Sequence, residues 1–190
     1  MKTDIILAGV GGQGILSIAT IIGQAALEEG LYIKQAEVHG MSQRGGDVQS
    51  NLRISDTEIA SDLIPQGGAD IIIAMEPMEA LRYKEFLAKD GWIITSSNPF
   101  INISNYPQEE SIINELKQVS NLILIDTDAV GKENNLSRSV NMILLGAASK
   151  ALKSISFEKL CESVKTIFGR KGEDIVAMNI KALELGRNCK

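Results

Sequence analysis

Residues 4–14 read DIILAGVGGQG, a short apolar run followed at once by a glycine-rich loop, and this stretch decides the expected fold. Apolar residues then recur at helical spacing over residues 15–27, which predicts a helix that begins directly after Gly14. Gly30 is placed to end that helix, and residues 32–38 have the composition of a second strand. The segment therefore predicts a β-α-β unit with parallel strands and a right-handed crossover.

The rest of the chain continues this alternation after one interruption. Residues 48–54 and 58–64 flank a polar turn at residues 55–57 and predict a β-hairpin inserted into the parallel sheet. The further strands are predicted at residues 70–74, 92–96 and 122–126, and the further helices at residues 77–91, 107–120, 137–152, 156–168 and 173–185. We predict an α/β fold in a single domain over residues 1–190: a doubly wound, mainly parallel, Rossmann-like sheet with a hairpin insertion and a C-terminal helical segment that covers the sheet.

Composition narrows the function classes. A net charge of -5 and a pI near 5.0 argue against a nucleic-acid or membrane-surface partner, because both repel an acidic protein. No apolar run reaches the roughly 18 residues that a membrane span needs, and the first residues contain no apolar signal region, so a cytoplasmic protein is expected. The two cysteines, Cys161 and Cys189, are too few for an iron–sulfur cluster or a structural zinc site. Cys161 is predicted to be a small core residue.

The first glycine loop is the sharpest local feature. Gly9, Gly11 and Gly14 match G-x-G-x-x-G between a strand and a helix, where bare backbone amides and the helix dipole favour a phosphate or pyrophosphate. The same glycines also suit a tight turn packed against another subunit. A P-loop is disfavoured, because Ile15 and Leu16 occupy the positions of its lysine and hydroxyl residue. A nicotinamide dehydrogenase stays open, with Glu37 near the position of a ribose-binding acid.

A second polar, glycine-rich loop spans residues 39–46. Arg44 supplies a fork for phosphate or carboxylate, Ser42 supplies a hydrogen-bond donor, and Gly45 and Gly46 allow close approach to the backbone. The alternatives are a solvated turn or a docking surface for another chain. The lone histidine, His39, is predicted to be a structural hydrogen-bonding residue and not a catalyst.

Other polar and sulfur-containing residues have simpler explanations. Asp126 and Asp128 follow a predicted strand and are expected to be turn or helix-cap residues, because no further metal ligand accompanies them. Met75 and Met78 are expected to fill gaps in the core. The sequence therefore predicts neither catalytic nor metal-ligating residues in this chain.

Together, GVGGQG at residues 9–14 and AEVHGMSQRGGDVQSNLRIS at residues 36–55 resemble the gamma-type domain of the 2-oxoacid:ferredoxin oxidoreductases. HGMSQRGG is most similar to the indolepyruvate type. The resemblance implies a subunit in the oxidative decarboxylation of an aryl 2-oxoacid, with coenzyme A as acyl acceptor and ferredoxin as electron acceptor. It also implies that thiamine diphosphate, Mg²⁺ and 4Fe–4S clusters belong to a large partner subunit, because this chain lacks the motifs for them.

The hypothesis from the resemblance is that this subunit completes the active site of its partner and helps to bind coenzyme A. The residues that carry it are Gly9, Gly11, Gly12, Gly14, Ser42, Arg44, Gly45 and Gly46. Two alternatives remain at this point: a stand-alone NAD- or FAD-binding oxidoreductase, and a non-catalytic assembly module whose glycines only allow close packing.

Overall fold

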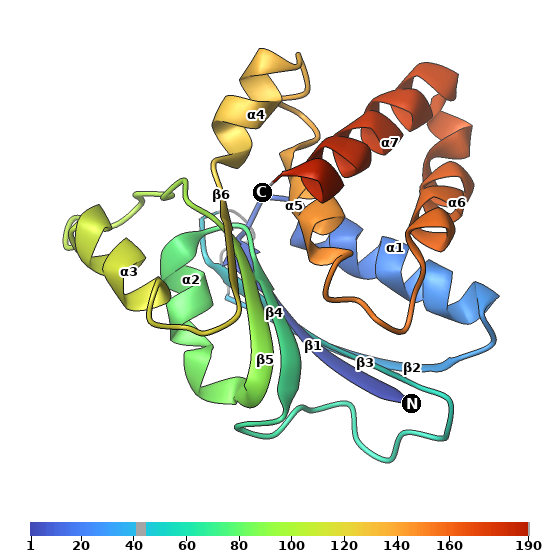
Figure 1. The fold of residues 1–190 in the computed structure, drawn as a ribbon, viewed down its shortest axis with the longest axis horizontal. Coiled ribbons are helices and arrows are strands. Elements are labelled where there is room, and N and C mark those ends of the chain that lie inside the picture. The colour runs from blue at the N-terminus through green and yellow to red at the C-terminus, as the bar shows by residue number, and fades with distance from the viewer. Residues whose placement is uncertain (41–44, 190) are drawn as a thin grey trace.

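A computed structural model of the protein describes residues 1–40 and 45–189. It contains one six-stranded sheet with the order β2-β3-β1-β4-β5-β6 and helices on both faces (Figure 1). The strands are β1 (Lys2–Val10), β2 (Tyr32–His39), β3 (Asp47–Ser55), β4 (Ala69–Ala74), β5 (Leu87–Ser96) and β6 (Leu122–Ile125). The helices of the described part are α1 (Ile15–Glu28), α2 (Pro77–Arg82), α3 (Glu109–Leu116), α4 (Thr127–Glu133), α5 (Val140–Ala148), α6 (Phe157–Phe168) and α7 (Glu173–Asn188).

The predicted α/β class and mainly parallel sheet are confirmed, and the hairpin is confirmed with different strands. β1, β4, β5 and β6 pair in parallel, whereas β3 pairs antiparallel with both β1 and β2. The hairpin is therefore β2–β3, closed by residues 40–46, and β3 separates β2 from β1. The two strands of the predicted β-α-β unit point the same way but are not neighbours.

The second predicted hairpin strand, residues 58–64, is wrong, because this segment is an irregular loop. The side chain of Arg53 holds it: one guanidinium nitrogen donates to the carbonyl oxygens of Ser61 (3.0 Å) and Leu63 (2.9 Å). The other two nitrogens bind the buried carboxylate of Asp4 at 2.8 and 3.0 Å. Since side-chain donors satisfy these carbonyls, the loop does not need a neighbouring strand.

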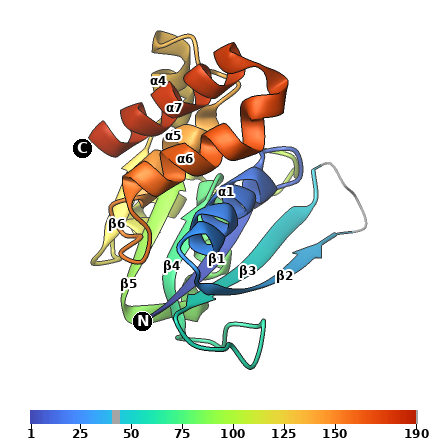
Figure 2. The same ribbon diagram turned by 90° about the vertical axis from the view of Figure 1, so that its right-hand side faces the viewer.

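The core lies on both faces of the sheet, because neighbouring residues of each buried strand point to opposite sides. On β1, Ile5 and Leu7 pack under α1 and α5, while Ile6 and Ala8 pack on the side of α2 and α3. The prediction that all the terminal helices cover the sheet is wrong for α6 and α7. α6 packs on α1 and α7 packs on α5, so the two form an outer layer (Figure 2).

Several helix boundaries also differ from those predicted. α2 ends at Arg82, and a short 3-10 turn leads into β5, because Leu87 already pairs with Ala69 of β4. Pro77 stands in the first turn as expected, whereas α3 begins only at Glu109 and α4 was not predicted at all. The other differences are small. α1 ends at Glu28, two residues before Gly30, whose φ of 73° fits the expected stop. In the described part of the chain, no helix is long and apolar enough to cross a membrane.

Candidate functional site

The two glycine loops meet at the carboxyl end of β1. The N–H of Gly11 donates to the carbonyl of Gly46 at 2.8 Å, and the N–H of Gly45 donates to the carbonyl of Gly11 at 3.3 Å. The fold thus brings together two segments that the sequence separates by about thirty residues. Ser42 and Arg44, which were predicted for this site, lie outside the described residues, as does the side chain of His39.

The glycines of the first loop serve different physical purposes. A side chain at Gly9 would begin 2.9 Å from both Gln13 Oε1 and Ile15 Cγ1, and one at Gly14 would begin 2.6 Å from Asn141 Nδ2. Gly12 has a φ of 105° and faces open space. Gly9 and Gly14 are therefore required for packing, whereas Gly12 is the glycine that leaves room for a ligand.

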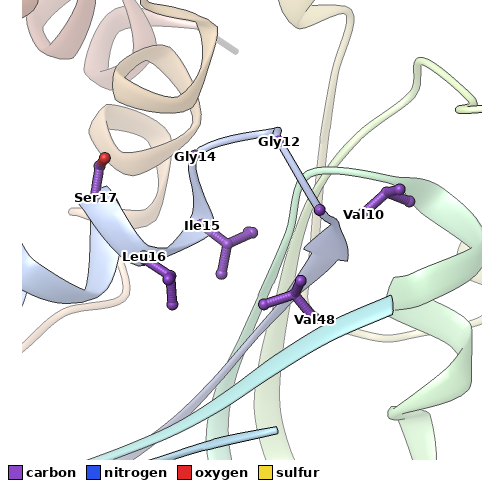
Figure 3. A pocket seen from close by; sticks show the side chains of 8 residues that line it. Val10, Gly12, Gly14, Ile15, Leu16, Ser17 and Val48 are labelled. Atoms are coloured by element: carbon purple, nitrogen blue, oxygen red, sulfur yellow. The ribbon is translucent and has the colours of Figure 1, made fainter. Parts of the chain in front are cut away.

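A cavity of about 390 Å³ opens beside this loop. Its wall combines glycine backbone with four aliphatic side chains, and Figure 3 shows Ile15 at the start of α1 and Val48 on β3 pointing toward one another. Gly11, Gly12 and Gly14 line it together with Val10, Ile15, Leu16, Ser17 and Val48. The crevice is open, so a small anionic group has space against the backbone.

Unpaired backbone donors belong to residues that line this cavity. Within the described residues, the N–H groups of Gly12, Gly14 and Ile15 have no hydrogen-bond acceptor. α1 has no acidic residue in its first turn and no side-chain cap, so nothing on the helix offsets the positive end of its dipole. The turn is held rigidly, because Val10 N–H donates to Gln13 Oε1 at 2.7 Å and Gln13 N–H donates to the Val10 carbonyl at 3.1 Å. This arrangement suits a phosphate or pyrophosphate.

A second, more polar cavity of about 440 Å³ lies on the other side of the same loop, beyond β5 and β6. Asn98 organises its wall: its Oδ1 accepts from Ser96 Oγ (2.8 Å), Thr127 Oγ1 (3.2 Å) and the Asp128 N–H (3.0 Å). Its Nδ2 donates to Asp126 Oδ1 at 2.9 Å. Asp126 also caps α4 through the Ala129 N–H (2.8 Å), which confirms its predicted role and lowers the pKa of its carboxyl group.

A cluster of buried polar side chains connects these loops to the segment after β5. Glu76, 1% exposed, accepts from the Tyr106 hydroxyl, and its other oxygen caps α2 through the Glu79 N–H at 2.9 Å. Tyr83 donates to Asp47 at 3.2 Å. Burial raises the pKa of both tyrosines, so they remain hydrogen-bond donors at neutral pH. In the described residues no cluster of His, Cys, Asp or Glu could hold a metal ion.

The geometry weakens the dinucleotide alternative. A ribose-binding acid must end the strand that lies next to the glycine-loop strand, but β3 lies between β1 and the strand that carries Glu37. Two strand spacings place Glu37 roughly 10 Å from the line of β1. Its carboxylate instead accepts from Gln35 Nε2 at 2.7 Å.

Two polar residues near the loop were not predicted from the sequence: Arg138 and Asn141. Asn141, on α5, donates from Nδ2 to the Gly14 carbonyl at 3.2 Å. Residues 137–139 lie in the connection between α4 and α5. The prediction assigned them to a helix, so Arg138 was treated as an ordinary charged residue on a helix surface. Only the sheet order places α5 beside the loop that opens α1.

Comparisons with known proteins identify a matching family model and full-length relatives of this chain. Residues 4–189 match the family model described as pyruvate ferredoxin/flavodoxin oxidoreductase. The chain is 36% identical to indolepyruvate oxidoreductase subunit IorB of Archaeoglobus fulgidus, over 99% of this chain and 95% of the relative. It is 34% identical to the Pyrococcus horikoshii subunit of the same name, over 96% and 93%.

Solved structures share the fold. A 2-oxoglutarate:ferredoxin oxidoreductase from Magnetococcus marinus, solved with 2-oxoglutarate, coenzyme A and succinyl-CoA, superposes with a TM-score of 0.76 at 24% identity. The match covers 98% of this chain but only 30% of that one. Pyruvate oxidoreductase subunit PORC from Thermotoga maritima gives a TM-score of 0.72 at 19% identity, over 97% and 94% of the two chains.

Proposed function

Because the chain belongs to the pyruvate ferredoxin/flavodoxin oxidoreductase family, we propose that it is the small subunit of a cytoplasmic indolepyruvate:ferredoxin oxidoreductase. In this proposal the complex converts an aryl 2-oxoacid and coenzyme A to an acyl-coenzyme A and CO₂, and passes the electrons to ferredoxin. The identity of 36% to an indolepyruvate oxidoreductase subunit, over nearly the full length of both chains, supports this substrate class.

One observation carries the role of this subunit: the open cavity beside Gly12 with unpaired amides on Gly12, Gly14 and Ile15. In the proposal, these amides and the start of α1 bind the pyrophosphate of coenzyme A. The aliphatic side chains of Val10, Ile15 and Leu16 line the adjoining cavity and exclude water from the apolar part of the coenzyme. Ser42, Arg44, Gly45 and Gly46 remain predicted members of the same site.

The redox cofactors belong to the large partner subunit in this proposal. When bound there, thiamine diphosphate and iron–sulfur clusters supply the decarboxylation and the electron transfer. The residues of this chain do not fit either group: its two cysteines lie on α6 and after α7, and the described part offers no metal-binding cluster. The chain alone is therefore expected to be inactive.

The first experiment is reconstitution. Co-expression with the large subunit should yield a complex in which indolepyruvate reduces a low-potential acceptor only when coenzyme A is present. A well-formed complex that is inactive with every 2-oxoacid would contradict the proposal. Tight binding of NAD or FAD to the isolated chain, without binding of coenzyme A, would favour the dinucleotide alternative.

A matched pair of variants tests the loop. Gly12 and Gly172 have nearly the same φ, 105° and 106°, and open space around each, so alanine strains the backbone similarly at both. Gly12→Ala should raise the KM for coenzyme A about tenfold, because the amides turn away from the pyrophosphate, and Gly172→Ala should change it by less than about twofold. An unchanged KM in the Gly12 variant, with weaker assembly of the complex, would indicate a packing module instead.

A further inference from the structure

The two cavities beside the first glycine loop share Gly12 and Gly14 in their walls. They differ in chemistry. The first is lined by aliphatic side chains of α1, β1 and β3, whereas the second has amide and hydroxyl side chains in its wall and is also lined by Arg138. A ligand whose central group is bound at the loop can therefore extend in two directions, one apolar and one polar.

Arg138 is the cation of the polar cavity, and within the described part of the chain its exposed side chain makes no hydrogen bond or ion pair. The amides around it are already engaged. The Asn98 side chain makes four hydrogen bonds, and the Asn141 side chain binds the Gly14 carbonyl and the Met142 N–H. The wall is thus preformed, and Arg138 is the side chain whose donors remain available to a ligand.

Coenzyme A has the matching asymmetry about its pyrophosphate. On one side is the adenosine with a doubly ionised 3′-phosphate, and on the other is the largely uncharged pantetheine arm. Guanidinium binds a phosphate through paired, charge-assisted hydrogen bonds, whereas an aliphatic wall binds a neutral arm by excluding water. Each cavity therefore fits one end of the coenzyme.

We propose that the polar cavity is the subsite for the nucleotide end of coenzyme A and that Arg138 binds its 3′-phosphate. This inference rests on the proposed function and adds to it the direction in which the coenzyme lies: the nucleotide points toward α4 and α5, and the pantetheine arm runs over Ile15 and Val48 toward the β2–β3 hairpin. The reactive thiol then leaves this chain on the hairpin side, where the partner subunit must supply the acyl group.

Asp128 lines the same cavity and carries the opposite charge. Its backbone N–H donates to Asn98 Oδ1, and in the described residues its carboxylate has no cationic partner. If the subsite binds an anion, this carboxylate opposes binding, so its removal must not weaken binding. The charge of Asp128 therefore provides a variant with an effect opposite to that of Arg138.

The test compares coenzyme A with dephospho-coenzyme A, which lacks only the 3′-phosphate, as acyl acceptors for the reconstituted complex. Arg138→Gln should raise the KM for coenzyme A about tenfold and leave that for dephospho-coenzyme A within about twofold. Asp128→Asn should leave the KM for coenzyme A unchanged or lower it. Arg170→Gln, an exposed arginine between α6 and α7, is the matched control and should change neither value.

Three results would overturn the assignment of Arg138: equal KM values for the two coenzymes in the unaltered complex, an equal increase for both in Arg138→Gln, or no increase for either. These failures are distinguishable from failure of the proposed function. If Gly12→Ala raises both KM values while Arg138→Gln raises neither, the loop binds the coenzyme and only its orientation is wrong.

Discussion

At the scale of single residues, the structure separates glycines that a sequence motif treats as equivalent. Gly9 and Gly14 leave no space for a side chain, whereas Gly12 opens onto a cavity. The motif predicted all of them as binding residues, because the local pattern contains no information on what packs against each position. The packing partner of Gly14 is Asn141, which is 127 residues away in the sequence.

The buried carboxylate of Glu79 gives a prediction about pH. Glu79 is 3% exposed and accepts from Arg82 at 2.8 and 3.1 Å. Burial raises its pKa above the usual 4.5, although Arg82 acts in the opposite direction. The folded state therefore retains the proton to a higher pH than the unfolded state, and the contribution of Glu79 to the free energy of unfolding falls as pH rises through this window.

Glu79→Gln removes this titration. The free energy of unfolding of the Glu79→Gln variant, relative to that of the unaltered chain, should therefore increase as pH rises from about 4 to about 7. Urea unfolding of the purified chains measures this difference. Glu162, which pairs with Lys159 on the surface, has a lowered pKa because of that hydrogen bond, so Glu162→Gln should show the opposite trend. The same trend in both variants would show that the burial of Glu79 does not control its ionisation.

At the scale of elements, local pattern predicted all six strands, together with one strand at residues 58–64 that is a loop, and it predicted the boundaries of several helices poorly. β1, β4 and α6 agree closely with the expectation, because each has a continuous apolar run or stripe with clear end signals, such as the Ser156 side chain that caps α6. α2 was predicted too long, because residues 83–91 were assigned to the helix, whereas residues 84–86 form a 3-10 turn and residues 87–91 belong to β5, which pairs with β4. Tertiary pairing overrides local preference there.

The contact between α5 and α7 gives a prediction at this scale. The two helices approach so closely that a side-chain carbon at Gly146 would lie 2.0 Å from the Leu183 carbonyl oxygen. Gly186 makes the reciprocal contact, 1.8 Å from the Ile143 carbonyl oxygen. Because both obstacles are backbone, the helices must separate to accept even a methyl group.

Gly146→Ala should therefore lower the free energy of unfolding by about 3 kcal/mol or more, as over-packed cores do. Gly23, inside α1, has open space at the same position, so Gly23→Ala should stabilise the chain by about 1 kcal/mol through helix propensity. Urea unfolding of the two variants measures the difference. Equal and small effects would mean that α7 does not pack on α5 through these glycines.

At the scale of the whole molecule, the α/β class was predictable and the strand order was not. Central strands such as β1 and β4 are apolar on both faces, so their sequences do not indicate which strand lies beside them. The antiparallel insertion of β3 between β2 and β1 depends on the seven-residue connection at residues 40–46. Because the sequence does not indicate which elements lie side by side, it also did not predict the polar cavity, whose walls come from β5, α4, α5 and the first loop.

The carboxyl edge of the sheet should be the face that contacts the partner subunit. The proposed coenzyme site opens at this edge, and the segment that follows β5 exposes three large apolar side chains beside it: Phe100, Ile101 and Ile103. That segment is anchored, because Asn102 Nδ2 donates to the Gly45 carbonyl at 2.5 Å. A shared active site requires the large subunit to lie against this edge, and burial of these side chains would stabilise the complex.

Ile101→Asp should therefore weaken the complex at least about tenfold, because it places an unpaired carboxylate in the contact. Leu63→Asp is the matched control: Leu63 is 58% exposed against 61% for Ile101, but it belongs to the loop between β3 and β4. Figure 1 shows this loop at the opposite edge of the sheet. Affinity is measured by titrating the labelled small subunit with the large one. If Leu63→Asp weakens the complex and Ile101→Asp does not, the partner covers the amino edge, and the glycine loops then face solvent instead of a shared active site.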